Sequence, residues 1–223
     1  MAKSVTVIIP TLNEGESIGE TIDSIPSDVP GMDIAILVID GNSTDNTVEE
    51  AEKRGAKVVT EKRRGYGRAY KTGFKEAKTE FIATMDGDTT YPGNEIPRMV
   101  ELLEKENLDF ISCNRLQKMD KGAMSFSHRV GNWGLTFFTN LLHRIKIGDS
   151  QTGMWVFRRE ILDKINLTSD GMPLSEEIKI EAWKNKDIKC LEVPVRYHIR
   201  VGEVKLNTWN DGVKNLWFLF TKR

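Results

Sequence analysis

The segment EFIATMDGD (80–88) decides the fold, because an apolar, strand-like run ends in two carboxylates, Asp86 and Asp88, with Gly87 between them. An isolated Asp-Gly step is typical of a turn. Two carboxylates one residue apart can also turn together toward a hard cation such as Mg²⁺ or Mn²⁺, which takes oxygen ligands and keeps substrate phosphate oxygens in its shell. Directly after an apolar strand, these three residues favour a site for a cation and a diphosphate.

The chain around this segment alternates strand-like and helix-like patterns. The run DIAILVID (33–40) is almost entirely apolar, as expected of a strand covered on both faces. The first half is predicted to contain strands at 5–10, 33–40, 56–60, 80–86 and 108–113, and helices within 14–25, 48–54, 66–77 and 94–105. Strands joined by helices of this length predict an α/β fold, in which a mostly parallel sheet lies between two helical layers.

After residue 115 the alternation becomes less regular. The predicted elements are an amphipathic helix within 131–145, a strand and a helix over 153–162, a helix over 173–185, a strand over 187–198 and a last helix from about Thr208. The sequence contains no repeat and no linker. We therefore predict one domain over 1–223, with a nucleotide-binding half (1–115) and an acceptor-binding half (116–223).

The composition is that of an ordinary globular protein. A chain of 223 residues with 39% hydrophobic and 29% charged residues can bury a core without disulfides, and Cys113 and Cys190 are interpreted as buried thiols in a reducing compartment. The net charge of −1 argues against nucleic-acid binding. The N-terminus lacks a signal-peptide pattern, and no apolar run reaches the length of about 18 residues that a spanning helix needs. We expect a cytoplasmic protein, or one peripheral on the cytoplasmic face of a membrane.

Polar side chains follow several of the predicted strands. Asn13 and Glu14 follow the first strand, and Asp40 ends the second. Because ligands of open α/β sheets bind outside the carboxyl ends of the strands, these side chains should converge with Asp86 and Asp88 on one edge. Asp40 is expected to accept a hydrogen bond from a base or ribose. The structural alternative is a turn at Asp40, with Ser43 or Thr44 capping the next helix.

The segment KRRGYGRAYKTGF (62–74) places cations, including Arg68, and glycines at the start of a helix. Helix N-termini favour phosphate, and glycine lets the backbone approach a ligand. No GKS or GKT follows, so the segment is not a Walker loop. A solvated basic turn is the alternative interpretation.

Six motifs in order carry a family resemblance: VIIPTLNE, VIDGNSTDNT, RRGYGRAYKTGF, DGD after a strand, DSQTGMWVFRRE and VPVRYHIRVGEVKL. The set resembles glycosyltransferase family 2, and within it the branch of dolichyl- and polyprenyl-phosphate sugar transferases. The resemblance extends from Val5 to about Leu206. It implies a GT-A fold, an inverting reaction, a UDP- or GDP-linked sugar donor, and Mg²⁺ or Mn²⁺ as cofactor.

The resemblance also implies roles for individual residues. The nucleotide-sugar site would comprise Pro10, Thr11, Asn13, Glu14, Asp40, Arg68, Asp86, Gly87, Asp88, Arg200 and Lys205, with the metal on Asp86 and Asp88. The catalytic residues would be Asp88, Arg115, Arg129 and Asp149, the two arginines holding the acceptor phosphate. The chain departs from the family pattern at Thr90, where a metal-binding Gln is frequent, and at Val204, where Ser is usual.

The class of acceptor decides which groups catalysis needs. A sugar hydroxyl requires a general base, for which Asp149 is the first candidate, ahead of Glu176 and Glu177. A lipid monophosphate is already anionic near neutral pH and needs only to be held, a task that the fork of an arginine performs well. The leading hypothesis is therefore transfer of a hexose or N-acetylhexosamine to dolichyl or polyprenyl phosphate. The alternatives are a family-2 enzyme acting on a sugar hydroxyl, and a nucleotide-sugar-binding protein or nucleotidyltransferase, against which PTLNEGES argues because it is not a GxGxR-type loop.

Two amphipathic segments fit a lipid substrate. GLTFFTNLL (134–142) and WNDGVKNLWFLFTKR (209–223) combine aromatic residues with nearby cations, a pattern that can lie in a membrane interface. The alternative is that both apolar stripes belong to the core. We expect the C-terminal helix to dock on a membrane, and deletion of 209–223 to abolish liposome binding.

Overall fold

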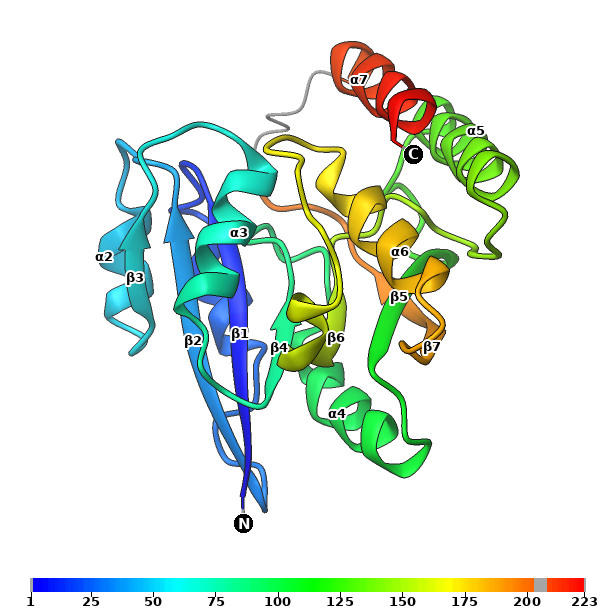
Figure 1. Ribbon diagram of the computed structural model, residues 1–223. Coiled ribbons are helices and arrows are strands. Elements are labelled where there is room, and N and C mark those ends of the chain that lie inside the picture. The colour runs from blue at the N-terminus through cyan, green and yellow to red at the C-terminus, as the bar shows by residue number, and fades with distance from the viewer. Residues whose placement is uncertain (1, 203–207, 223) are drawn as a thin grey trace.

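The computed structural model describes residues 2–202 and 208–222, and within them one seven-stranded sheet is covered by helices on both faces (Figure 1). The strands are β1 (Lys3–Thr11), β2 (Met32–Asp40), β3 (Lys57–Thr60), β4 (Phe81–Thr84), β5 (Phe110–Met119), β6 (Trp155–Arg158) and β7 (Cys190–Tyr197). The helices are α1 (Ile18–Asp23), α2 (Thr47–Glu52), α3 (Tyr66–Glu76), α4 (Ile96–Lys105), α5 (Phe126–His143), α6 (Leu174–Lys184) and α7 (Thr208–Thr221), with 3₁₀ turns η1 (Gly93–Glu95) and η2 (Arg159–Asp163).

The sheet has the order β3-β2-β1-β4-β6-β5-β7 and is mostly parallel, as predicted. Only β6 runs against its neighbours β4 and β5 within the described sheet. The chain leaves β5 at the carboxyl-end edge, forms α5 there, and re-enters the sheet from the same edge, so β6 must run in the opposite direction. This excursion places the 147–152 loop beside the ends of β4 and β5.

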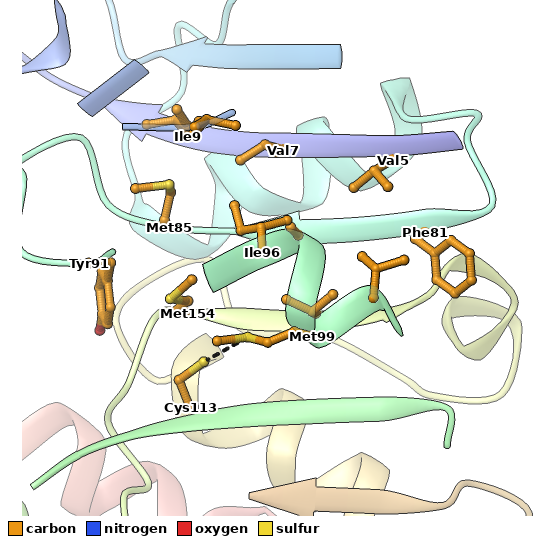
Figure 2. Packing of buried hydrophobic residues seen from close by; sticks show 14 of the residues in the cluster. Val5, Val7, Ile9, Phe81, Met85, Tyr91, Ile96, Met99, Cys113 and Met154 are labelled. Carbon is orange, nitrogen blue, oxygen red and sulfur yellow. Dashed lines mark hydrogen bonds between the residues drawn. The ribbon is translucent and has the colours of Figure 1, made fainter. Parts of the chain in front are cut away.

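Two apolar cores fix the layers. One face of the sheet packs on α1, α2 and α4 through residues such as Val7, Ile22 and Met99. Figure 2 shows this cluster, in which the thiol of Cys113 contacts the sulfur of Met99 at 3.5 Å. The other face packs on α3 and α6, with Trp155 fully buried among their apolar side chains. The predicted three-layer α/β/α arrangement is therefore confirmed.

The helices α5 and α7 lie side by side outside these layers (Figure 1). Their outward surface, which we call the α5–α7 apolar face, consists of Phe126, Val130, Trp133, Phe137 and Leu141 of α5 and Val213, Trp217 and Phe220 of α7. Trp133 is 67% exposed and Trp217 is 71% exposed. The alternative that these stripes belong wholly to the core is wrong, although Leu219 of α7 is buried. Within residues 2–202 and 208–222, none of the helices has both the length and the apolar character required to cross a bilayer.

Two local expectations are also wrong. Neither Ser43 nor Thr44 caps α2: the helix begins after Asn46, with no side-chain capping bond, because the Ser43 hydroxyl is bonded to Asp40 instead. The predicted helix after β6 is only the 3₁₀ turn η2.

Candidate active site

A cleft of about 570 Å³ opens at the carboxyl ends of β1, β2 and β4. The predicted donor-site residues that line it are Pro10, Thr11, Asn13, Glu14, Asp86, Gly87, Asp88 and Arg200. Asp40 and Arg68 are not in this lining, and Lys205 and Val204 lie outside the described residues. The structure thus gathers segments from both ends of the chain around one cavity, as the edge argument predicts.

Asp86 lies half-buried at this cleft, where its Oδ1 accepts a hydrogen bond of 3.1 Å from the hydroxyl of Tyr66. Burial, and then the negative charge of Asp88, raise the pKa of Asp86 to about 7. Gly87 separates the two acids where space is tight: a Cβ there would lie 3.1 Å from the Thr11 methyl group, which would have to shift by a few tenths of an ångström. Two carboxylates are therefore held close together, at an energetic cost that a cation would relieve.

Asp88 is 4% exposed, and both its oxygens accept hydrogen bonds. Oδ1 accepts from the backbone N–H and the hydroxyl of Thr90, at 3.2 and 2.6 Å, and Oδ2 accepts from Arg200 at 2.8 Å. A second nitrogen of Arg200 donates to Glu14 at 2.8 Å, so Arg200 links the β1 and β4 loops. Thr89 has φ 67°, which is rare for a β-branched residue and typical of strain kept at functional sites.

The donor set at this position fits a divalent cation. No group of three His, Cys, Asp or Glu side chains forms a metal cluster in the described part of the chain. Mg²⁺ and Mn²⁺ commonly bind through one or two carboxylates and complete their shells with water and substrate phosphate. Asp86, which faces the cleft, and Asp88, which Thr90 and Arg200 orient, supply that minimal set. In place of the frequent Gln, Thr90 acts here as a hydrogen-bond donor to Asp88.

Asp40 is 2% exposed and is bonded within the protein. Its Oδ1 accepts from the Ser43 hydroxyl at 2.5 Å and from the Thr11 hydroxyl at 3.3 Å, while its Oδ2 accepts from the Ser43 N–H at 2.9 Å. The turn alternative is therefore confirmed for Asp40. Its role on the nucleobase stays a prediction. Asn13, with φ 53°, accepts from the N–H of Thr44 at 2.8 Å and lies at the cleft itself.

The basic side chains of residues 62–68 have two kinds of surroundings: some line the cleft, and Arg68 is bonded to another loop of the protein. Lys62, Arg63 and Arg64 line the cleft. Arg68 instead pairs with Asp170, whose backbone oxygen also accepts from the Arg68 N–H at 3.0 Å. A Cβ on Gly65 or Gly67 would collide with the backbone of residues 169–171, so these glycines admit a protein loop rather than a ligand. The cations of this segment that line the cleft are therefore residues that the sequence interpretation did not single out.

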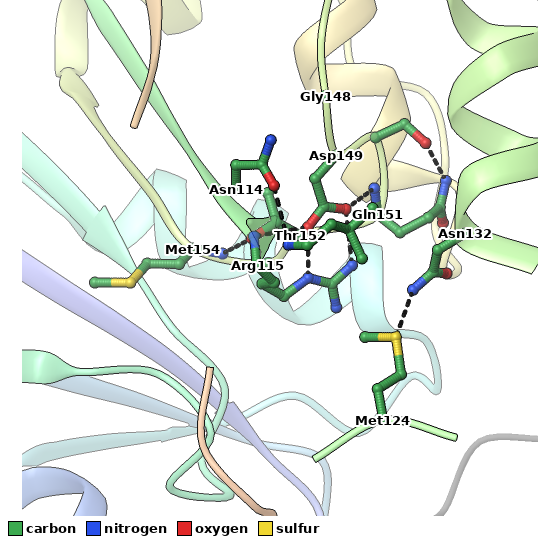
Figure 3. Close-up of polar contacts among 12 residues, drawn as sticks. Asn114, Arg115, Met124, Asn132, Gly148, Asp149, Gln151, Thr152 and Met154 are labelled. Carbon is green, nitrogen blue, oxygen red and sulfur yellow. Dashed lines mark hydrogen bonds and ion pairs between the residues drawn. The ribbon is translucent and has the colours of Figure 1, made fainter. Parts of the chain in front are cut away.

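Arg115 and Asp149 form a buried ion pair, and neither residue belongs to the lining of the cleft. Figure 3 shows the guanidinium of Arg115 turned toward the Asp149 carboxylate, with nitrogen–oxygen distances of 2.7 and 2.9 Å. Asp149 is fully buried, and burial opposes its charge, yet the charge and hydrogen bonds of Arg115 lower the pKa of Asp149 below its ordinary value. Arg129, which was predicted to hold the acceptor phosphate together with Arg115, is exposed on α5 and takes no part in this ion pair.

Comparison with known proteins gives the family. Residues 6–166 match the domain described as glycosyl transferase family 2. This chain belongs to that family. It is 33% identical over 222 residues to the low-salt glycan biosynthesis hexosyltransferase Agl6 of Haloferax volcanii, covering 98% of this chain and 54% of Agl6, so it spans about half the length of that relative. It is 32% identical over 209 residues to the dolichyl-phosphate hexose transferase of the same organism, covering 93% of this chain and 89% of that protein.

The fold of this family 2 glycosyltransferase also matches solved structures. Glucosyl-3-phosphoglycerate synthase from Mycobacterium tuberculosis, solved with Mn²⁺, UDP-glucose and phosphoglyceric acid, superimposes with a TM-score of 0.75 at 19% identity, covering 98% of this chain and 79% of the synthase. The predicted GT-A fold is confirmed.

The sequence interpretation of this glycosyltransferase missed two residues that shape the surroundings of Asp86, a candidate metal ligand. The Tyr66 hydroxyl reaches Asp86 only because residue 153 is glycine: a Cβ there would lie 2.4 Å from that hydroxyl and 3.1 Å from Asp86. Gly153 belongs to the DSQTG segment, so the motif contributes to the site through its glycine as well as through Asp149. Gly153 is visible in the sequence motif, but its role depends on its contact with Tyr66, which lies 87 residues away in the chain.

Two buried titratable side chains contact the 149–152 segment of this glycosyltransferase. Lys179 and Glu176 are both fully buried on α6. The Lys179 ammonium donates to the backbone oxygens of Ser150 and Thr152 at 2.6 and 2.9 Å, and burial lowers its pKa to about 7. Burial raises the pKa of Glu176 to about 8. Glu177, the other acid weighed as a base, accepts hydrogen bonds from Thr168, Ser169 and Lys222.

Proposed function

We propose that this glycosyltransferase transfers a hexose or N-acetylhexosamine from a UDP- or GDP-sugar to dolichyl or polyprenyl phosphate, with inversion at the anomeric carbon. The donor would lie in the cleft, which is lined by residues of the 1–115 half together with Met172 and Arg200. The acceptor would be bound by residues 116–223 together with Arg115. The name of one relative, a dolichyl-phosphate hexose transferase, agrees with this acceptor.

The donor side is supported by the charge distribution of the cleft. Lys62 and Arg64 supply positive charge on one wall, whereas Arg63 is ion-paired with Glu61 and Arg200 with Glu14 and Asp88. A diphosphate is bound well by such groups, and Asp86 and Asp88 together could hold a Mg²⁺ or Mn²⁺ that neutralises the leaving nucleoside diphosphate. Solved structures of the same fold contain Mn²⁺ and UDP-glucose, which agrees with this use of the cleft.

The single observation that carries the acceptor class is the α5–α7 apolar face. Monomeric proteins rarely expose a contiguous apolar patch of this kind unless it meets a membrane or another protein. Aromatic side chains at a lipid–water interface are typical of membrane contact. The two helices belong to the acceptor half, so a greasy acceptor can remain in the bilayer while its phosphate reaches the site.

The state of Asp149 favours a phosphate acceptor over a hydroxyl. Its carboxylate is committed to Arg115, and its pKa is lowered, so it is a weak base. A phosphate needs no base: an anionic oxygen forms the new bond to the anomeric carbon while the bond from that carbon to the donor diphosphate breaks. Arg115 uses Nε and Nη2 toward Asp149, and we propose that Nη1 contacts the acceptor phosphate.

The test is a transfer assay with a panel of donors and acceptors. Purified protein with Mn²⁺ is incubated with UDP- and GDP-sugars and with polyprenyl phosphate, 3-phosphoglycerate or a sugar acceptor, and released nucleoside diphosphate is measured. We expect release to be stimulated by polyprenyl phosphate and to disappear in Asp88→Asn, which should still unfold cooperatively. Stimulation by the sugar or by phosphoglycerate alone would contradict the lipid acceptor, and full activity of Asp88→Asn would contradict the site.

A further inference from the structure

The 147–152 loop is bonded to three helices. From α5, the Thr136 hydroxyl donates to the Ser150 hydroxyl at 3.1 Å, and the Asn140 amide donates to the Ile147 carbonyl at 2.8 Å. From α6, Lys179 donates to two carbonyl oxygens of the loop. The third helix, α7, reaches the loop through Asn215, which bonds to Gln151.

Gln151 receives that contact. Its Oε1 accepts a hydrogen bond of 2.7 Å from the Asn215 amide, and its Nε2 donates to the Ser150 hydroxyl and to Glu176, each at 2.9 Å. Because the amide accepts on one side and donates on the other, these partners fix which way it points. The contact with Asn215 is therefore one of three that orient the Gln151 amide, and it is the one that comes from α7.

The same residue touches the ion pair. The backbone N–H of Gln151 donates to Asp149 Oδ1 at 3.0 Å, and this oxygen also accepts from Arg115 at 2.9 Å (Figure 3). A continuous series of hydrogen bonds thus runs from α7 through Gln151 and Asp149 to Arg115. Removing one link should change how the carboxylate, and with it the guanidinium, is oriented.

Asn215 is costly for the fold. It is 5% exposed, and among the described residues its Oδ1 is a buried oxygen with no hydrogen-bond partner. An unpaired buried polar atom costs about 1–3 kcal/mol. A leucine at position 215 would remove this atom but would also leave Gln151 Oε1 without the hydrogen bond from Asn215.

We propose that Gln151 and Asn215 are positioning residues for Arg115, so that the seating of α7 sets how the acceptor phosphate is held. The inference rests on the proposed function, because it assigns Arg115 to the acceptor. On the opposite side of α7, Trp217 and Phe220 belong to the α5–α7 apolar face. The helix that would meet the lipid therefore also contacts the loop that orients the acceptor arginine.

The test compares Asn215→Leu and Gln151→Met with a matched control, Thr221→Val, which removes a hydroxyl bonded only to carbonyl oxygens of α7 itself. Three quantities are measured: the KM for polyprenyl phosphate, the rate of donor hydrolysis without acceptor, and the Arg115 Nε–H resonance in ¹⁵N-arginine-labelled protein, assigned with Arg115→Lys. In Asn215→Leu we expect a rise in KM of about tenfold, unchanged donor hydrolysis and a shifted resonance.

Gln151→Met should raise KM by at least as much, and Thr221→Val should behave as wild type. The inference is overturned if Asn215→Leu leaves both the KM and the resonance unchanged, or if donor hydrolysis falls in parallel with transfer, as general damage to the fold would cause. If the wild type fails to use polyprenyl phosphate, the proposed function is wrong. The resonance in Asn215→Leu then still decides whether α7 positions Arg115.

Discussion

At the scale of single residues, Asp86 is expected both to bind the metal and to destabilise the folded protein. Its pKa of about 7 lies above the ordinary value of 3.8. An acid whose pKa is raised by folding destabilises the folded state fully above the folded pKa, and this penalty fades as the pH falls toward the unfolded value. Asp86→Asn should therefore stabilise the protein by about 1–2 kcal/mol at pH 8 and progressively less between pH 7 and 4, while abolishing transfer. Tm measured against pH for both proteins checks this, and a gain that does not vary with pH would contradict it.

Arg115 and Arg129, paired by the sequence interpretation, should differ sharply in stability. Arg115→Ala leaves Asp149 as an unpaired buried charge, which costs about 3–5 kcal/mol, whereas an exposed change such as Arg129→Ala should stay within about 0.5 kcal/mol. Urea unfolding measures both. Arg115→Met combined with Asp149→Leu serves as the control, because replacing a whole buried pair with apolar groups is often nearly neutral. Equal stability of the two alanine variants would show that the pair is not formed as described.

At the scale of elements, the α5–α7 apolar face yields a prediction about membranes. Deleting 209–223 is a poor test, because α7 also buries Leu219 and Asn215 in the body of the protein. The triple change Trp133→Ser, Phe137→Ser and Trp217→Ser alters exposed side chains only. We expect it to weaken sedimentation with phosphatidylcholine vesicles at least tenfold, since each buried aromatic contributes about 1.5–3 kcal/mol, with little change in Tm. Leu191→Ser, an exposed apolar residue on β7, should bind as wild type does, and retained binding by the triple variant would exclude this face.

The elements also show how far sequence reasoning extends. The predicted strand at 33–40 and the helix at 66–77 agree closely with β2 and α3. Hydrophobic periodicity and the residues that end an element are local signals, so the sequence alone reveals them. The antiparallel direction of β6 depends on where the chain re-enters the sheet, which no local pattern encodes. The stripe containing Trp133 has the same spacing whether it packs in a core or faces lipid, so its exposure could not be read from the sequence.

The candidate site could likewise be predicted only in part. Asp86, Asp88 and Glu14 were placed at one edge because parallel strands bring their carboxyl ends together. The pairing of Arg115 with Asp149, across 34 residues, and of Arg68 with Asp170, across 102 residues, had no signal in the sequence. Arg68 was therefore assigned to the donor although it is bonded to a neighbouring loop, while Lys62 and Arg64 at the cleft were not assigned.

At the scale of the whole molecule, the cleft is closed by groups from distant parts of the chain. Glu14 and Asp88 come from the first half, and Arg200 joins both from beyond β7. A ligand that binds here should therefore stabilise the fold as a unit, by about 2.7 kcal/mol at one hundred times its Kd. For a domain of this size, that corresponds to a rise in Tm of about 5–10 °C with UDP or GDP and Mn²⁺ together. Thermal unfolding with each nucleotide also reports which base is preferred. The rise should be much smaller with nucleotide or Mn²⁺ alone and absent in Asp88→Asn, and an equal rise in that variant would place the nucleotide elsewhere.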